Sequence, residues 1–219
     1  MKVAVLGATG GTGSLVVDTL LARGHEVVAV SRSPTPLREP VARFAATAGD
    51  LTDPAFLHKA IDDCAAVISC LGQNRSSKSL FARRTSPPDI LRRVAAATIA
   101  AIGSGPQHLI YLSAFGVGED RHRHALLFRI ILRLSSIHDA YLDHAEAEAA
   151  IKQSQVRWTI VRPPGLTEKD AEVPLADKGD HWSSFETISR RSLATFLVQC
   201  AERQGPLART MTVGEVAGR

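Results

Sequence analysis

The sequence predicts an α/β protein with a doubly wound, mostly parallel sheet that carries helices on both faces. Three observations support this fold class. Short apolar segments recur along the 219 residues, helical patterns separate them, and a glycine-rich turn follows the first apolar segment. Strands of a parallel sheet are covered on both faces, so they are continuously apolar rather than alternating. Regular alternation of strand and helix indicates right-handed βαβ units.

Six apolar segments are expected to form strands of this sheet. They are 2–6 (KVAVL), 26–30 (EVVAV), 65–70 (AAVISC), 108–113 (HLIYLS), 158–162 (WTIVR) and, as a weaker last strand, 211–213 (MTV). One more strand is expected before the sequence GDLTD at 49–53, where the third strand of such a sheet belongs.

Besides the segment at 121–134 considered below, four helices are expected between the strands. They are 11–23, 88–102, 138–153 and 191–202. The first two patterns end at Gly24 and Gly103, and glycine just beyond a helical pattern is a common C-terminal signal. In the last helix the apolar residues recur at i, i+3, i+4, i+7 and i+8, which is the spacing of one buried face.

Length and composition predict a single domain, residues 1–219, in a cytoplasmic protein. This length suits one large domain, and 45% hydrophobic residues provide a substantial core. The net charge of +4 is spread along the chain and aromatic residues make up only 5%, which is unlike a nucleic-acid-binding surface. No apolar run approaches the roughly 20 residues that span a membrane. The three cysteines form no CxxC pair, so we expect reduced thiols and no metal site.

Two segments are expected to cover the substrate, around 115–140 and 163–187. Apolar residues nearly surround the helix expected at 121–134, so this helix either packs in the core or serves as a lid or homodimer contact. Residues 163–187 show no clear periodicity, and long irregular excursions are often functional loops. His181 and Trp182 in this loop either form the roof of the substrate pocket or anchor the loop.

The glycine-rich turn GATGGTG at 7–13 predicts a nucleotide-binding loop. Gly7 permits a tight turn, Gly10 lets the backbone approach a diphosphate, and Gly13 allows helix and strand to pack closely. The helix that begins here offers free N–H groups and a partial positive charge to a phosphate. The other cofactor contacts predicted in this loop are Thr9, Gly11 and Thr12.

The end of the second strand favours NADP(H) over NAD(H). NAD-dependent proteins usually have a carboxylate there that accepts from the ribose 2′-hydroxyl, whereas this chain has Arg32 between two serines. An arginine can pair with a 2′-phosphate, and the alternative is an exposed loop residue. After the third strand, Asp50 is a candidate partner of the adenine amino group. Alternatively, this segment only caps a helix at Thr52 or Asp53.

Six motifs, spread from residue 1 to about 215, recur together in one known group of proteins. They are GATGGTG, GDLTD, CLG at 70–72, LSAFGVG at 112–118, DH at 143–144 and WTIVRPPGLTE at 158–168. With them the sequence resembles the atypical short-chain dehydrogenase/reductase group, the NmrA-like and NAD(P)H-binding proteins, and within it the biliverdin-IXβ reductase/flavin reductase type. The resemblance implies a Rossmann fold and further cofactor contacts at Leu51, Leu71, Gly72 and Pro163.

The resemblance also implies catalytic residues near the end of the fifth strand. Ser113 matches the serine that the family places beside the nicotinamide. His144 stands near the usual lysine position, where the flavin reductase type has a histidine that contacts the cofactor; the alternative is a buried core histidine. The Tyr-x-x-x-Lys pair is missing, since Ala145 follows Tyr141 at that spacing. Gly165 follows the two prolines, where the flavin reductase type has a second histidine.

The missing Tyr–Lys pair leaves two hypotheses for the function. Reduction of a ketone needs a proton donor such as this pair, whereas a flavin, quinone or tetrapyrrole delocalises the charge and needs mainly close placement of two flat rings. The first hypothesis is therefore an NAD(P)H-dependent reductase of a flat conjugated acceptor. The second is an NADP(H)-binding, redox-sensing regulator of NmrA type without turnover. A nucleotide-sugar epimerase or dehydratase is disfavoured, because it needs the pair.

Overall fold

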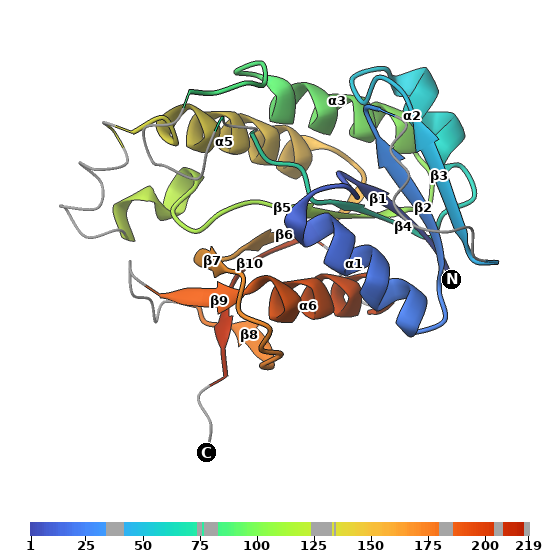
Figure 1. Cartoon of the computed structure of the whole chain (residues 1–219). Coiled ribbons are helices and arrows are strands. Elements are labelled where there is room, and N and C mark those ends of the chain that lie inside the picture. Colours follow the sequence, from blue (N-terminus) through green and yellow to red (C-terminus); the bar gives the residue numbers. More distant parts are fainter. Residues whose placement is uncertain are drawn as a thin grey trace.

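One sheet of eight strands forms the centre of the protein (Figure 1). The computed structural model describes residues 1–33, 42–73, 76, 83–123, 133, 135–179, 186–203 and 208–216. Across the sheet the order is β3 (Phe44–Ala48), β2 (Glu26–Ser31), β1 (Lys2–Leu6), β4 (Ala66–Ser69), β5 (His108–Leu112), β6 (Arg157–Arg162), β10 (Ala208–Glu215) and β8 (Leu175–Asp177). Only β8, at the edge, pairs antiparallel among these strands. The predicted fold class is confirmed.

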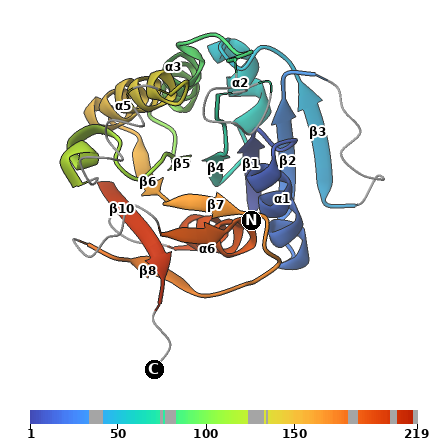
Figure 2. The ribbon, with the colours of Figure 1, turned by 60° about the vertical axis from the view of Figure 1, so that its left-hand side comes forward.

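Helices cover both faces of the sheet, as the alternating pattern predicts (Figures 1 and 2). On one face α1 (Gly11–Ala22) packs against α6 (Arg190–Glu202). On the other face α2 (Pro54–Ile61) packs against α3 (Ile90–Ile102), which in turn packs against α5 (His138–Gln153). The short 3-10 helix η1 (Gly118–Arg123) follows β5, and β7 (Gly165–Thr167) pairs with β9 (Thr187–Ser189) just before α6.

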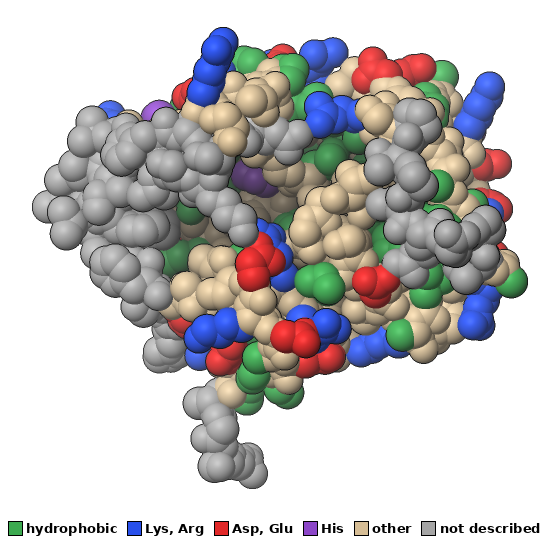
Figure 3. All heavy atoms as spheres, in the orientation of Figure 1, with side chains coloured by type: hydrophobic (Ala, Val, Ile, Leu, Met, Phe, Trp, Pro, Cys, Tyr) green, Lys and Arg blue, Asp and Glu red, His purple; other side chains and the backbone are tan. Residues whose placement is uncertain are grey.

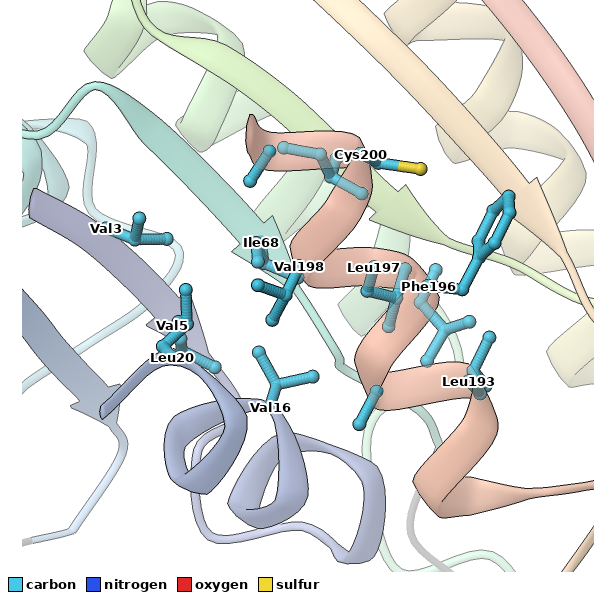
Figure 4. Packing of buried hydrophobic residues seen from close by; sticks show 14 of the residues in the cluster. Val3, Val5, Val16, Leu20, Ile68, Leu193, Phe196, Leu197, Val198 and Cys200 are labelled. Atoms are coloured by element: carbon cyan, nitrogen blue, oxygen red, sulfur yellow. The ribbon is translucent and has the colours of Figure 1, made fainter. Parts of the chain in front are cut away.

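The apolar faces of α1 and α6 meet over the sheet in one buried cluster (Figure 4). Val16 of α1 and Leu197 of α6 are both fully buried there, as is Val5 of β1. All five residues of the stripe predicted for the last helix are buried, namely Leu193, Phe196, Leu197, Cys200 and Ala201. A second cluster fills the opposite face, between the strands and α2, α3 and α5. The helical spacing of the apolar residues therefore identified the buried faces correctly.

Differences from the predicted elements are confined to short or half-polar segments. The helix α2 was expected only through the alternative interpretation of GDLTD as a helix cap, because its eight residues give few turns of pattern. That cap is confirmed at Asp53, which accepts from the N–H of Ala55 at 2.9 Å. The last strand covers 208–215 rather than 211–213, since its first two residues, Ala208 and Arg209, are exposed and give no continuous apolar pattern. The excursion at 163–187 contains β7, β8 and the start of β9, each of three residues.

The strand order reverses beside β1, and this reversal positions the site. From β1 the chain moves outward to β2 and β3, then returns to place β4 on the other side of β1. In open α/β sheets ligands bind at such a switch point, beyond the carboxyl ends of the strands. Most of the predicted apolar helix at 121–134, together with His181 and Trp182, lies outside the described residues. Among the described residues, no helix has the length and apolar character needed to cross a membrane.

Candidate functional site

A groove lies at the switch point, beyond the carboxyl ends of β1, β2 and β4. Its lining residues are Gly7, Thr9, Gly10, Ser31, Arg32, Leu51, Cys70, Leu71, Gly72, Ser86, Ile90, Leu91 and Val94. Seven of these are predicted cofactor contacts, which the fold brings together from four loops. In Figure 3 the surface is hollowed between the α3–α5 layer and the start of α1, and a histidine side chain is visible inside the hollow.

The wall that the start of α3 contributes was not predicted. Ser86, Ile90, Leu91 and Val94 come from this region, and they carry no motif of their own in the sequence. They line the groove because α3 runs antiparallel to the sheet and begins next to the end of β4. Among the predicted contacts, Gly11, Thr12, Gly13, Asp50, Ser113, His144 and Pro163 are not part of this groove's lining.

Two of the three spaced glycines, Gly7 and Gly13, are required by the backbone geometry. Gly7 has a positive φ of 80°, in the left-handed region that glycine favours. A β-carbon on Gly13 would lie 2.1 Å from the carbonyl oxygen of Gly7, which no other residue type tolerates. The turn therefore brings the first residues of α1 directly against the end of β1, as the spacing of the glycines predicts.

The start of α1 is open to an anion. Its first N–H groups have no partner within the helix, the N-cap Gly10 provides no side-chain hydrogen bond, and the first turn contains no acidic residue. The helix dipole adds a partial positive charge at this end. Free N–H donors and positive charge are what a phosphate group requires, so the loop fits the diphosphate of a dinucleotide.

At the end of β2 the described lining of the groove has a basic residue and no carboxylate. Arg32 is exposed and lines the groove, while the hydroxyl of Ser31 donates to the carbonyl of Ser33 at 2.7 Å. Asp50 is held in its own loop, because its carboxylate accepts from the backbone N–H and the hydroxyl of Thr52 at 2.8 Å each. Both hydrogen bonds lower the pKa of Asp50, and the one from the backbone N–H of Thr52 has the larger effect. Its contact with adenine stays a prediction.

Ser113 follows directly after β5 and has a buried hydroxyl. Its N–H donates to the carbonyl of Val161 at 2.8 Å, and the side chain is on the same side of the strand as Tyr111. The Oγ atom has no hydrogen-bond partner among the described residues, although Ser113 is only 5% exposed. A buried hydroxyl without a partner costs free energy, so such a group indicates a partner that a ligand supplies.

His144 lies on α5 and is buried beside the same strand. Its Nδ1 is 2.9 Å from the hydroxyl of Tyr111, and the two rings meet edge to face with centroids 5.7 Å apart. Burial lowers the pKa of His144 to about 4, although neighbouring carboxylates oppose this, and burial raises the pKa of Tyr111 well above 10. The imidazole is therefore neutral near pH 7. The same side of the helix packs in the core, since Ala147 and Ile151 are fully buried.

Asp143, next to His144, holds the start of α3 in place. Its carboxylate accepts from the backbone N–H groups of Leu91 and Arg92, both at 2.9 Å. It also accepts from the side-chain amide of Gln73 at 3.1 Å, in the loop that follows β4. The carboxylate replaces the cap that α3 lacks from its own N-cap, Asp89. Asp143 therefore connects α5 to two walls of the groove, the start of α3 and the loop after β4. The DH motif at 143–144 did not reveal this role of the aspartate.

A buried arginine connects the loop after β5 to β6 and α5. Arg162 is 1% exposed and contacts Glu148 of α5, Asp120 at 2.8 Å and Glu119 at 3.1 Å. Burial opposes its charge, but the hydrogen bonds and charge of Glu148, then those of Glu119, outweigh this and raise the pKa of Arg162. Because η1 follows Ser113 by only a few residues, this cluster fixes the loop that carries the serine.

The pKa of Glu119 predicts how stability depends on pH. Burial opposes its ionisation, but hydrogen bonds from Lys152 and Arg162 outweigh burial and lower the pKa from 4.5 to about 2. A carboxylate with a depressed folded-state pKa stabilises the protein above its unfolded pKa, and this contribution is lost as the pH falls towards the folded pKa. We therefore expect the free energy of unfolding to fall between pH 4.5 and about 2, and to fall less steeply in Glu119→Gln.

Urea unfolding at several pH values measures this difference. Glu146→Gln is the control for loss of one negative charge, since Glu146 is about as exposed as Glu119, with 60% against 61% for the side chain. A Glu119→Gln curve parallel to that of the unaltered protein would contradict the assignment.

Fold and groove together define a Rossmann protein of the dinucleotide-binding class. The sequence model described as NAD(P)H-binding matches residues 7–204, so the chain belongs to the NAD(P)H-binding family. This family membership confirms the resemblance that the motifs indicate.

Similar proteins include named reductases. The chain is 28% identical to the chloroplastic divinyl chlorophyllide a 8-vinyl-reductase of Zea mays, with 97% of the chain and 54% of the relative covered, so it spans about half the length of that relative. The oxidoreductase YlbE of Lactococcus lactis has the same fold, with a TM-score of 0.79, 16% identity and coverage of 99% and 91% of the two chains. ChuY of Escherichia coli O157:H7, described as an anaerobillin reductase, also has this fold. Its TM-score is 0.75 and its identity 18%, with coverage of 100% of this chain and 99% of ChuY.

Proposed function

We propose that the protein is an NADPH-dependent reductase of a flat conjugated acceptor, of the tetrapyrrole, flavin or quinone class. The observation that carries this proposal is the buried hydroxyl of Ser113 beside β5, which has no hydrogen-bond partner among the described residues. In addition, the sequence has Ala145 where a lysine would follow Tyr141 in a Tyr-x-x-x-Lys pair. Burial raises the pKa of Tyr141 to about 12, which makes this phenol a weak proton donor. An acceptor that delocalises its charge suits such a site better than a ketone does.

The chain's own residues have distinct roles in this proposal. A bound reduced nicotinamide supplies the hydride. Ser113 donates a hydrogen bond at the reacting end of the site. His144 stays neutral because its pKa is about 4, and the contact with Tyr111 fixes the orientation of its ring. A neutral imidazole positions a ligand without acting as a strong acid, so water delivers the proton to the reduced acceptor.

The tetrapyrrole class receives additional support from the relatives. Two of them are named for reduction of a chlorophyllide and of anaerobillin, and both are conjugated tetrapyrroles. We propose that the segments around 115–140 and 163–187 cover the acceptor. The second candidate function is a redox-sensing regulator, which the missing lysine favours equally. Tight binding of NADP(H) without turnover would distinguish this regulator from a reductase.

A panel of acceptors tests the proposed reaction. We expect oxidation of NADPH, followed by its absorbance, with a linear tetrapyrrole, free FMN or a quinone, and none with an aliphatic ketone. Ser113→Ala removes one hydrogen bond made at the reacting end, which is worth about 1–2 kcal/mol, or roughly a 5- to 30-fold loss in kcat/KM.

Ser104→Ala, at an exposed serine after α3, is the matched control and leaves turnover unchanged. If no flat acceptor is reduced above background while NADPH still binds, the regulator is the correct function.

The choice between NADPH and NADH depends on Arg32 in this proposal. Arg32→Ala should weaken NADPH binding by about tenfold and leave NADH binding little changed. The effect on NADPH lies at the lower end for a charge-assisted contact, because Arg32 is exposed. Arg32→Asp should reverse the preference, since a carboxylate accepts from the ribose hydroxyl and repels a phosphate. Titration of both nucleotides into the three proteins measures this. Equal affinity of the unaltered protein for NADH and NADPH would exclude the preference.

A further inference from the structure

Arg190, the first residue of α6, lies against the glycine loop. Its Nη1 donates to the hydroxyl of Thr12 at 2.9 Å. A β-carbon on Gly11 would lie 3.5 Å from its Nε and 3.7 Å from its Cζ, so the guanidinium rests on the glycine at the start of α1. Sequence motifs did not indicate this contact, which joins residues 178 positions apart.

The position of this cation is electrostatically unusual. A helix N-terminus has a partial positive charge and favours anions, while cations are stabilising at the opposite end. Here a full positive charge lies beside the uncapped start of α1, whose first turn contains no acidic residue. Such an arrangement is favourable when an anion lies between the guanidinium and the helix.

One carboxylate balances this charge from the solvent side. Nε of Arg190 donates to Glu168 at 3.2 Å, and the side chain of Glu168 is 60% exposed. Glu168 directly follows β7, in the segment that leads away from the two prolines after β6. Acidic and basic side chains lie next to each other at the lower rim of the hollow (Figure 3). An exposed ion pair of this kind is weak and can be exchanged for a stronger partner.

We propose that Arg190 binds the diphosphate of the nicotinamide dinucleotide, and that the diphosphate displaces Glu168 from the guanidinium. The diphosphate carries two negative charges against one on Glu168, and it also satisfies the free N–H groups of α1. The inference rests on nucleotide binding at the glycine loop and is independent of the acceptor. Glu168, once displaced, links cofactor binding to the segment after β7.

The adjacent residue Arg191 provides a matched control. It lies on the same helix turn, has the same charge and also pairs with an exposed carboxylate, that of Asp170. It makes no contact with the glycine loop among the interactions recorded for the described residues. Comparison of the two arginines therefore separates contact with the diphosphate from a general effect of positive charge.

Nucleotide titrations with three variants test the proposal. Arg190→Gln should weaken NADH, NADPH and ADP-ribose by a similar factor, about tenfold for one charge-assisted contact. Arg191→Gln should change each dissociation constant less than about twofold, because a distant exposed charge is screened by salt. Glu168→Gln should tighten binding of all three ligands, since it removes the competing carboxylate.

The sign of the Glu168→Gln effect distinguishes this proposal from a structural role. If Arg190 only fastens α6 to α1 through Thr12 and to the segment after β7 through Glu168, both Arg190→Gln and Glu168→Gln weaken binding and lower the stability of the free protein, and the proposal is wrong. It is also wrong if Arg190→Gln behaves like Arg191→Gln. If Arg190→Gln does not fold, Glu168→Gln and Arg190→Lys replace it, and the proposal is still judged by whether loss of the Glu168 carboxylate tightens or weakens nucleotide binding. Turnover of the unaltered protein is measured separately, so failure of the acceptor proposal does not affect this result.

Discussion

The close approach of Gly13 to the carbonyl of Gly7 is the constraint on which the rest of the site depends. A side chain at position 13 would fill the space between the end of β1 and the first turn of α1. Because glycine has no side chain, α1 begins directly at the end of β1. Its free N–H groups therefore point into the crevice where the strand order reverses. The roles proposed for Arg190 and Arg32 both depend on this geometry, because it is the start of α1 that would hold the phosphates of the dinucleotide.

Buried polar groups on α5 hold the remaining walls around that site. Asp143, His144 and Glu148 are all less than a tenth exposed, and each pairs with a different element: α3, β5 and β6. A buried carboxylate is costly unless it is hydrogen-bonded, so these contacts restrict how the elements can be arranged. The helix is therefore not a simple amphipathic one; its buried side specifies the position of its neighbours as well as covering the core.

Local sequence pattern predicted the fold and the glycine loop because both depend on neighbouring residues. Continuous apolar runs and spaced glycines are visible within windows of a few residues, and the resulting strands and turn are present. The parts that were not predicted depend on distant contacts. Nothing near Asp143 or Arg190 in the sequence indicates that the first caps another helix or that the second touches Thr12. Strands of three residues, such as β7 and β8, are likewise too short to give a pattern.

The central claim is that the loop at 7–13 holds the diphosphate of NADP(H), with the 2′-phosphate on one side and the reacting ring on the other. A crystal structure with NADP⁺ tests this most directly. The account predicts density for the diphosphate over the first turn of α1, the 2′-phosphate against Arg32 and the nicotinamide beside Ser113. A nucleotide bound elsewhere, or one whose diphosphate does not contact the start of α1, would contradict it.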